Sequence, residues 1–520
     1  MELGGNLYDS QLTALLAMLL IALFYYCYKR MQGRLLLLPP GPSPLPIIGN
    51  LHQLGKLSHQ ALHELSKKHG EIMYLRFGSI PSVVVSSTKM ATQVLNVHDH
   101  VLASRPGVSR VKYMLYDKYG IAMAPYGEHW RLMRKICTLE LFAPKRLKRY
   151  KDPRMQEVCF MLQSIYKEYS SKPGGAVDYT EKLCALGMDI VSRMLLSKRI
   201  ANSFDRDSAD FRALFDETLA LLATFNLGDF IPYLAWLIAP LGQQGRLRKV
   251  HQRLDFVLEK SIREHEQHAH AKKDQDLSND LLDVLLNIKF DGVDQTQHNL
   301  SRISVKGVIA DLLTGGSHTS SSTIIWAMAE LLHKPTLLTR AQREIDTIVG
   351  DSRTVDESDI PQLKFLMAIV KETFRLHPAA PLLVPHCSVE TCELAGYTIP
   401  RGTQILVNAW AIGRDPSVWQ NPLEFNPDRF LEEHIHVDVL GHNMELIPFG
   451  AGRRKCPAIG LGLCIVQHTL ACLLHCFEWR LPDGHKVDLG ETRKLVLGMR
   501  KAPELVPTPR ATTPLYMKTP

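Results

Sequence analysis

The stretch IPFGAGRRKCPAIGLGLC, residues Ile447–Cys464, constrains this chain more than any other feature. It places Cys456 after two glycines and three consecutive cations, and directly before a proline that opens an apolar run. Pro457 suits the first position of a helix, so the pattern predicts that Cys456 caps that helix. Cations and a helix N-terminus both lower the pKa of a thiol, and the thiolate is the metal-binding form. The sequence therefore predicts a functional thiolate, and the alternative is a buried, inert cysteine.

A lone thiolate narrows the kinds of metal site that this loop can build. No second Cys, His or acidic residue stands beside Cys456 at zinc spacing, and a single thiolate ligand suits haem iron. Phe449, Gly452, Arg454 and Cys456 match the signature FxxGxRxCxG of the cytochrome P450 family, although Ala458 stands where that signature ends in glycine. Over nearly its whole length the chain resembles the endoplasmic-reticulum members of this family from plants. The resemblance implies haem b as the cofactor, Cys456 as the axial iron ligand and Phe449 as a shield for the sulfur.

Two further motifs of the family are present. Glu372 and Arg375, in KETFR, match its ExxR motif and are one helical turn apart. Arg429, in FNPDRF, matches the third partner of that motif. The resemblance implies a buried carboxylate held by two guanidinium groups, an arrangement that is costly to break. A surface ion pair is the alternative for Glu372 and Arg375 taken alone.

The resemblance also implies donors for the haem propionates. The segment HWRLMRK looks like the WxxxR motif of the family, and PLLVPHCS has a histidine where the family uses arginine or histidine. Groups that donate hydrogen bonds suit carboxylates. The residues expected to bind the propionates are Trp130, Arg134, His386 and Arg454.

The segment GGSHTS resembles the oxygen-binding motif of the family. Gly315 and Gly316 would leave room for dioxygen, and Thr319 would donate its hydroxyl to the distal oxygen. His318 stands where the family usually has Asp or Glu. Because an imidazole can relay protons near neutral pH, we expect His318 and Thr319 to be catalytic and monooxygenation to be retained. The alternative is that His318 turns outward and only packs.

An uncharged apolar run lies near the N-terminus. As one helix, Ser10–Tyr28 is long enough to cross about 30 Å of hydrocarbon. Lys29, Arg30 and Arg34 follow it, which by the positive-inside rule places the bulk of the chain in the cytosol. The sequence thus predicts a single-pass protein of the endoplasmic-reticulum membrane with a lumenal N-terminus (1–9), a transmembrane anchor (10–28), a basic and proline-rich hinge (29–50) and a haem-binding catalytic domain (51–520).

Most of the catalytic domain shows apolar residues at helical spacing, with fewer strand-like runs. The polar segment Arg263–Asp280 is expected to be a solvated loop. Its histidines His265, His268 and His270 are not expected to bind a metal, because they lack the spacing of the HExxH helix pair. Together with the resemblance, this predicts a mainly α cytochrome P450 fold, a large helical domain with a smaller β-rich lobe. Helices are expected over Glu128–Phe142, Ser304–Lys334 and Pro361–His377, and strands near 72–87 and at Thr403–Trp410.

The net charge and the motifs of the chain also indicate which partners it is expected to bind. Its net charge of +8 comes without a zinc-finger, homeodomain or aromatic-interleaved pattern, so nucleic acid is not expected as a partner. It has no GxGxxG after a strand and no flavin motif, so NADPH is expected to act indirectly. The resemblance implies NADPH:cytochrome P450 reductase as the electron donor. A basic face could dock that acidic partner; it would comprise Arg131, Lys135, Lys145, Arg146, Lys148, Arg149, Arg453 and Lys455.

The substrate pocket implied by the resemblance is mostly apolar. Its five segments are 111–116, 222–226, 311–315, 379–384 and 494–497. They favour hydroxylation of a small lipophilic molecule with dioxygen, and a terpenoid (monoterpene or diterpene) is the expected class. The main alternative is a phenylpropanoid or flavonoid; the others are a haem-thiolate enzyme that is not a monooxygenase and a silent haem or lipid binder. Asp311 could orient a substrate hydroxyl or face a polar neighbour.

Overall fold

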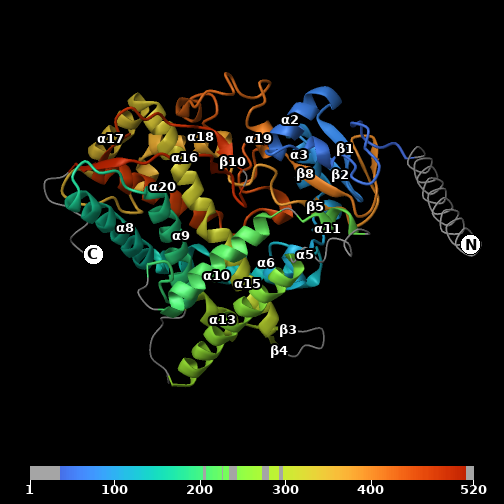
Figure 1. The fold of residues 1–520 in the computed structure, drawn as a ribbon, viewed down its shortest axis with the longest axis horizontal. Helices are drawn as coiled ribbons and strands as arrows, with labels where there is room; N and C mark the ends of the chain where they lie inside the picture. Colours follow the sequence, from blue (N-terminus) through green and yellow to red (C-terminus); the bar gives the residue numbers. More distant parts are fainter. Residues whose placement is uncertain are drawn as a thin grey trace, which may run out of the picture.

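The computed structural model describes residues 36–202, 206–224, 226–232, 243–271, 280–291, 297–492 and 494–510. Helices dominate these residues, and a smaller lobe of strands lies to one side of them, drawn mainly in blue and orange (Figure 1). The expected division into a helical domain and a β-rich lobe is therefore confirmed. The predicted transmembrane anchor, residues 10–28, lies outside the described residues.

The helical part is built around a shared apolar core. Helices α15 and α9 pack against each other, and α16 packs against α20 and α18 (Figure 1). In chain order the helices are α2 (Ser58–His69), α3 (Thr88–Thr92), α4 (Asp99–Leu102), α5 (Ser109–Met114), α6 (Glu128–Ile136), α7 (Pro144–Arg149), α8 (Lys151–Ser171), α9 (Tyr179–Leu196), α10 (Arg206–Ala223), α11 (Leu227–Phe230), α13 (Gln243–Ala271), α14 (Leu281–Asn287), α15 (Arg302–Ser317), α16 (Thr319–His333), α17 (Pro335–Val349), α18 (Lys364–Leu376), α19 (Ala409–Ile412) and α20 (Ile459–Cys476).

The β-rich lobe is centred on a four-stranded sheet in the order β1-β2-β8-β5. Strands β1 (Ile72–Phe77) and β2 (Ile80–Val85) are antiparallel, β2 and β8 (Gln404–Val407) are parallel, and β5 (His386–Cys387) is antiparallel to β8. Every residue from Ser82 to Val85 is buried, because both faces of β2 are covered. Four antiparallel pairs complete the strands: β3 (Lys289–Asp291) with β4 (Gln297–Asn299), β6 (Cys392–Leu394) with β7 (Tyr397–Ile399), β9 (Phe477–Arg480) with β12 (Val506–Pro509), and β10 (Glu491–Thr492) with β11 (Gly498–Met499).

The described part of the proline-rich segment packs on this lobe. Residues 37–50, which we call the proline strap, contain no helix and no named strand. The backbone N–H of Tyr74 in β1 donates to the carbonyl of Pro40 at 2.9 Å, and that of Thr398 in β7 donates to the carbonyl of Leu37 at 2.7 Å. Prolines lack the N–H groups that would continue a ladder, so the strap lies along the lobe without becoming a strand.

One described helix, α20, is long and apolar enough to cross a membrane. It is the core helix that follows the Cys456 loop, and 72% of it is buried inside the fold. Burial on this scale is typical of a core helix of a globular protein, which passes the same length and composition test.

Several helix boundaries differ from the sequence prediction. The expected helix Ser304–Lys334 is interrupted at His318, where α15 ends and α16 begins (φ −108°, ψ −19°). Two glycines precede the interruption, and the hydroxyl of Thr319 donates to the carbonyl of Gly315 at 2.8 Å. Hydroxyls that bond to backbone carbonyls one turn back compete with the regular ladder and bend helices.

The expected loop Arg263–Asp280 is also partly wrong, because α13 continues to Ala271. Leu254, Leu258 and Ile262 are buried and carry the apolar face of α13 up to the supposed loop. An ion pair one turn apart, Arg263 to Glu259 at 3.1 Å, adds local support. Amphipathic spacing therefore outweighs the polar composition of this segment.

Candidate functional site

A cavity of about 330 Å³ lies in the helical part, where α6, α15, α16 and α18 meet the loop before α20. Apolar side chains make up most of its lining. It brings together most of the residues that the sequence singles out, although these are far apart in the chain. The predicted site residues in its lining are Trp130, Arg134, Thr319, His386, Phe449, Arg454 and Cys456. His318, Glu372, Arg375 and Arg429 lie outside the lining.

The loop that carries Cys456 is tightly folded. The N–H of Cys456 donates to the carbonyl of Phe449 at 2.9 Å, which closes the loop on itself. Gly452 has a φ of +64°, and a Cβ on it would lie 1.8 Å from the carbonyl oxygen of Leu95, so only glycine fits there. Phe449 packs edge-on against Phe374, with ring centroids 5.2 Å apart.

The predicted helix start at this loop is wrong by two residues. Helix α20 begins at Ile459 with Ala458 as its N-cap, so Cys456 precedes the cap and does not form it. Ala458 has a φ of −104°, which suits any L-residue, so alanine replaces the glycine of the family signature without backbone strain.

The electrostatics of the thiol also differ from expectation. Burial raises the pKa of Cys456, and the N–H of Ala458 and the Arg134 guanidinium only partly oppose this shift. Arg453 is turned away and pairs with Asp99 at 2.9 Å. The thiolate is therefore stabilised by the N–H of Ala458 and by Arg134, and burial outweighs both.

Three arginines share the cavity with Cys456. They are Arg105, Arg134 and Arg454, and no carboxylate among the described residues is ion-paired with any of them. Burial, with repulsion from Arg105 and Arg134, lowers the pKa of Arg454 to about 8, and burial lowers that of Arg105 to about 9. Burial and the nearby Arg105 also hold the pKa of His386 well below its usual range. The three guanidinium groups therefore make their part of the cavity electropositive, and the acidic group in the cavity lining is the buried Asp311, which is not ion-paired with any of them.

The side-chain donors of these residues form hydrogen bonds to backbone carbonyls. Arg454 donates to the carbonyls of Ala103 (2.6 Å) and Ile121 (3.3 Å), and its guanidinium lies over the Trp130 ring at 4.2 Å. Trp130 donates to the same Ile121 carbonyl at 3.1 Å. Carboxylates are stronger acceptors than carbonyls for such donors.

The donor set fits haem b. A sulfur ligand and a cluster of unpaired cations line the same largely apolar cavity, and haem b offers iron and two carboxylates on a flat apolar ring. Arg105 is a member of this cluster that the sequence analysis missed. It stands alone in VLASRPG, and no motif marks it in the sequence.

The three residues of the ExxR set meet in a buried cluster outside the cavity. Glu372 accepts from Arg375 at 2.7 and 2.8 Å and from Arg429 at 3.1 Å. All three side chains are at most 4% exposed. The surface ion pair that was the alternative is excluded by this burial.

Thr319 and His318 are neighbours in sequence but face different surroundings. Thr319 lines the cavity, whereas His318 does not. The Nδ1 atom of His318 lies 2.9 Å from the hydroxyl of Ser317. Burial lowers the pKa of His318, with the charges of Asp216 and Lys494 acting in opposite directions. Any path for protons between His318 and the cavity would therefore need an intermediary group.

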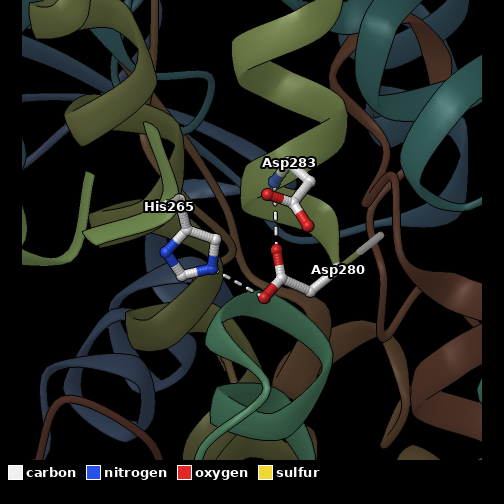
Figure 2. A group of neighbouring side chains, drawn as sticks. All are labelled: His265, Asp280 and Asp283. Carbon is white, nitrogen blue, oxygen red and sulfur yellow. Dashed lines mark hydrogen bonds and ion pairs between the residues drawn. The ribbon is translucent and has the colours of Figure 1, made fainter. Parts of the chain in front are cut away.

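A second group of ligand-type side chains lies away from the cavity. His265, Asp280 and Asp283 place their ligand atoms within 4.8 Å of one another (Figure 2). The ligand atoms of His265 and Asp280 already bond to other protein groups. The two ring nitrogens of His265 face the carbonyl of Ser261 and the carboxylate of Asp280, each at 2.8 Å, while Asp280 also accepts from the N–H of Asp283 at 3.0 Å and the hydroxyl of Ser197 at 2.9 Å.

This group is best described as an ion pair. Both ring nitrogens of His265 face acceptors, and only the protonated ring can donate twice. Burial opposes that charge, but the hydrogen bond and the charge of Asp280 outweigh it and raise the pKa of His265.

Comparison with known proteins bears on the identity of the site. The family model for Cytochrome P450 matches residues 39–506. The chain belongs to the cytochrome P450 family. A zebrafish cytochrome P450, in a structure with progesterone, has the same fold, with a TM-score of 0.72 and 27% sequence identity over 86% of this chain and 99% of that one.

The relatives of this P450 correct the expected substrate class. A flavonoid 3′,5′-hydroxylase from Campanula medium is 40% identical over 91% of both chains. A flavonoid 3′-monooxygenase from Arabidopsis thaliana is 39% identical over 97% of this chain and 98% of its own. These relatives favour the phenylpropanoid and flavonoid alternative, and the terpenoid expectation is wrong. An apolar pocket lining does not distinguish the two classes, because both substrates are largely hydrocarbon.

Membership of the family fixes the cofactor and the reaction type. The chain is a P450 monooxygenase that uses haem b, with electrons supplied from NADPH through a reductase. Plant members of the family are typically bound to the membrane of the endoplasmic reticulum.

Proposed function

We propose that this P450 hydroxylates a flavonoid or a closely related phenolic compound. The observation that carries the proposal is the pairing of a cavity that fits haem b with close similarity to flavonoid hydroxylases over almost the full chain. The apolar side chains that dominate the cavity suit a flat aromatic substrate.

The residues of the cavity have separate roles in this proposal. Cys456 would be the axial ligand of the iron, shielded by Phe449 in the closed loop. Haem b, when bound, supplies the activation of dioxygen for insertion of one oxygen atom into a C–H bond. Thr319 would donate its hydroxyl to the oxygen, and His318, which does not line the cavity, would relay protons to it through an intermediary group. The haem propionates would bind to Trp130, Arg134, His386, Arg454 and Arg105.

The buried Glu372 cluster has a supporting role. Arg375 also donates to the carbonyls of Gly413 and Pro422, and so joins α18 to the chain that leads toward the Cys456 loop. We assign to Glu372, Arg375 and Arg429 the bracing of that segment.

The proposal also assigns an electron donor and a membrane location to the enzyme. The electron donor would be NADPH:cytochrome P450 reductase, docking on the basic face that includes Arg131 and Lys135. The chain would be held on the endoplasmic-reticulum membrane by residues 10–28, with the catalytic domain in the cytosol.

The test is expression in microsomes with reductase and NADPH, followed by incubation with a panel of flavanones, flavones, flavonols and simple phenylpropanoids. We expect a hydroxylated product from at least one flavonoid and a reduced carbon-monoxide spectrum of the thiolate type. Cys456→Ser is expected to lose that spectrum and all turnover. Turnover of simple phenylpropanoids alone would contradict the flavonoid assignment, and an intact thiolate spectrum in Cys456→Ser would contradict the ligand assignment.

A further inference from the structure

One wall of the cavity contains a strained residue. Residues 379–384, which we call the cavity wall, follow α18, and most of them line the cavity. Within this wall Leu383 has a φ of +52°, in the left-handed region that residues other than glycine and asparagine rarely adopt. A strained conformation persists only where the surrounding structure holds the chain in place. Arg105 holds the end of the wall by donating to the carbonyl of Val384 at 2.7 Å.

Two backbone hydrogen bonds hold the start of the cavity wall. The N–H of Leu497 donates to the carbonyl of Ala379 at 2.9 Å, and the N–H of Trp410 donates to the carbonyl of Pro381 at 3.1 Å. Leu497 directly precedes β11, and Trp410 lies in α19. The position of the wall ahead of Leu383 therefore depends on where α19 and the β10–β11 hairpin lie.

One carboxylate joins these two segments. Glu491 lies in β10, which pairs with β11. Its Oε1 atom accepts from the indole Nε1 of Trp410 at 2.8 Å. Its Oε2 atom accepts from Nε2 of Gln60 in α2 at 2.7 Å and lies at the same distance from Nε2 of His59. Glu491 thus fastens the hairpin to α19 and to α2, although these segments are far apart in the chain (Figure 1).

The surroundings of Glu491 keep its carboxylate charged. The side chain is 6% exposed, and burial alone would raise its pKa, but the hydrogen bonds from His59 and Trp410 hold the pKa at about 2. The guanidinium of Arg414 lies 4.0 Å from Oε1 and 3.8 Å from the centre of the Trp410 ring. Hydrogen bonds to a charged acceptor are roughly twice as strong as those between neutral groups. The carboxylate therefore holds Trp410 more firmly than a neutral acceptor would.

We propose that Glu491 is a positioning residue for the cavity wall. Because it fixes Trp410 and the β10–β11 hairpin, it keeps the carbonyls of Ala379 and Pro381 in place and so holds Leu383 in its left-handed conformation. Glu491 itself does not line the cavity, so its effect on a ligand is indirect. The wall is shaped in this way whichever substrate the enzyme oxidises.

The test is a spectroscopic titration of the full-length, haem-loaded protein in microsomes with two probes, imidazole and 4-phenylimidazole. Both bind to haem iron through a ring nitrogen, and only the second carries an aromatic ring that can contact the cavity wall. In Glu491→Ala we expect the affinity for 4-phenylimidazole to fall about fivefold or more relative to that for imidazole. The reason is that a ligand binds more weakly when the conformation it needs is only partly populated.

Three further variants separate positioning from a general loss of structure. Glu491→Gln keeps one acceptor for the Trp410 indole and should have an intermediate effect. Trp410→Phe removes the indole N–H but keeps the backbone N–H that binds Pro381, so it should lower the relative affinity for 4-phenylimidazole while retaining the carbon-monoxide spectrum. Glu393→Ala, at an exposed position of β6, is the matched control and should leave the ratio of the two affinities unchanged.

The ratio of the two affinities decides the outcome. If Glu491→Ala leaves it unchanged, shifts it in favour of 4-phenylimidazole or weakens both probes equally, the positioning role is refuted. Where Glu491→Ala does not retain haem, the same three results in Trp410→Phe refute it.

Discussion

The buried Glu372 cluster allows a quantitative prediction about stability. The Glu372 carboxylate is fully buried and accepts four hydrogen bonds, three from Arg375 and Arg429 and one from the N–H of Asn426 at 2.7 Å. Glu372→Ala would leave two buried guanidinium groups without their counter-charge. Removal of one partner from a buried ion pair typically costs about 3–5 kcal/mol. We therefore expect the free energy of unfolding to fall by about that amount.

A graded series makes this prediction specific. Glu372→Gln keeps the volume and one acceptor but removes the charge, so it should cost about 1.5–3 kcal/mol, the range for hydrogen bonds to charged groups. The matched control is Glu64→Ala, which breaks the Glu64–Lys67 pair at the same three-residue spacing on the exposed surface. We expect the control to leave stability unchanged.

The assay is guanidinium unfolding followed in parallel by far-UV circular dichroism and haem absorbance. The expected order of midpoints is wild type and Glu64→Ala highest, then Glu372→Gln, then Glu372→Ala. If Glu372→Ala unfolded at the same midpoint as Glu64→Ala, the carboxylate would not balance the two arginines. A midpoint for Glu372→Gln below that of Glu372→Ala would show that the amide donor, and not the lost charge, destabilises the cluster.

Three further predictions concern the loop, the ion pair and the oxygen site. Gly452→Ala should prevent haem incorporation, because its Cβ would lie 1.8 Å from the Leu95 carbonyl oxygen; an intact carbon-monoxide spectrum would contradict this. The raised pKa of His265 means that its pair with Asp280 stabilises the fold fully below about pH 6.5 and progressively less as pH rises through the folded-state pKa. His265→Gln should therefore lower the melting temperature at mildly acidic pH and have little effect at alkaline pH, and an equal effect at both would count against the charged pair. Thr319→Ala should divert electrons to hydrogen peroxide while substrate binding is retained, as measured by peroxide formed per NADPH consumed; unchanged coupling would refute the role of its hydroxyl.

Features that depend on neighbouring residues were predictable from the sequence. The Cys456 loop and the Glu372–Arg375 pair each lie within a short motif, and Arg429 joins that pair in the structure as the family pattern implied. When two residues share a turn or a helix face, their separation in the sequence decides whether their side chains can come into contact. Strands β1 and β2 likewise lie within the short strand-like runs predicted near residues 72–87.

Features that depend on tertiary contacts were not predictable. The sequence offered no sign that Arg105 would join the cations of the cavity, because its partners are carbonyls near residues 122 and 384. The interruption at His318 depends on hydroxyl contacts within an otherwise continuous apolar pattern. The substrate class was wrong for a related reason: an apolar lining indicates that a pocket takes a lipophilic ligand, but it does not identify the class of that ligand.

The proline strap has a mechanical consequence. Its carbonyls at Leu37 and Pro40 are bonded to β7 and β1, so the chain entering the fold is fastened to the β-rich lobe along its length. A force applied at residue 36 would act on the β-rich lobe itself, because the strap is bonded to the lobe and cannot rotate freely relative to it. The strap therefore couples the position of residue 36 to the orientation of the β-rich lobe.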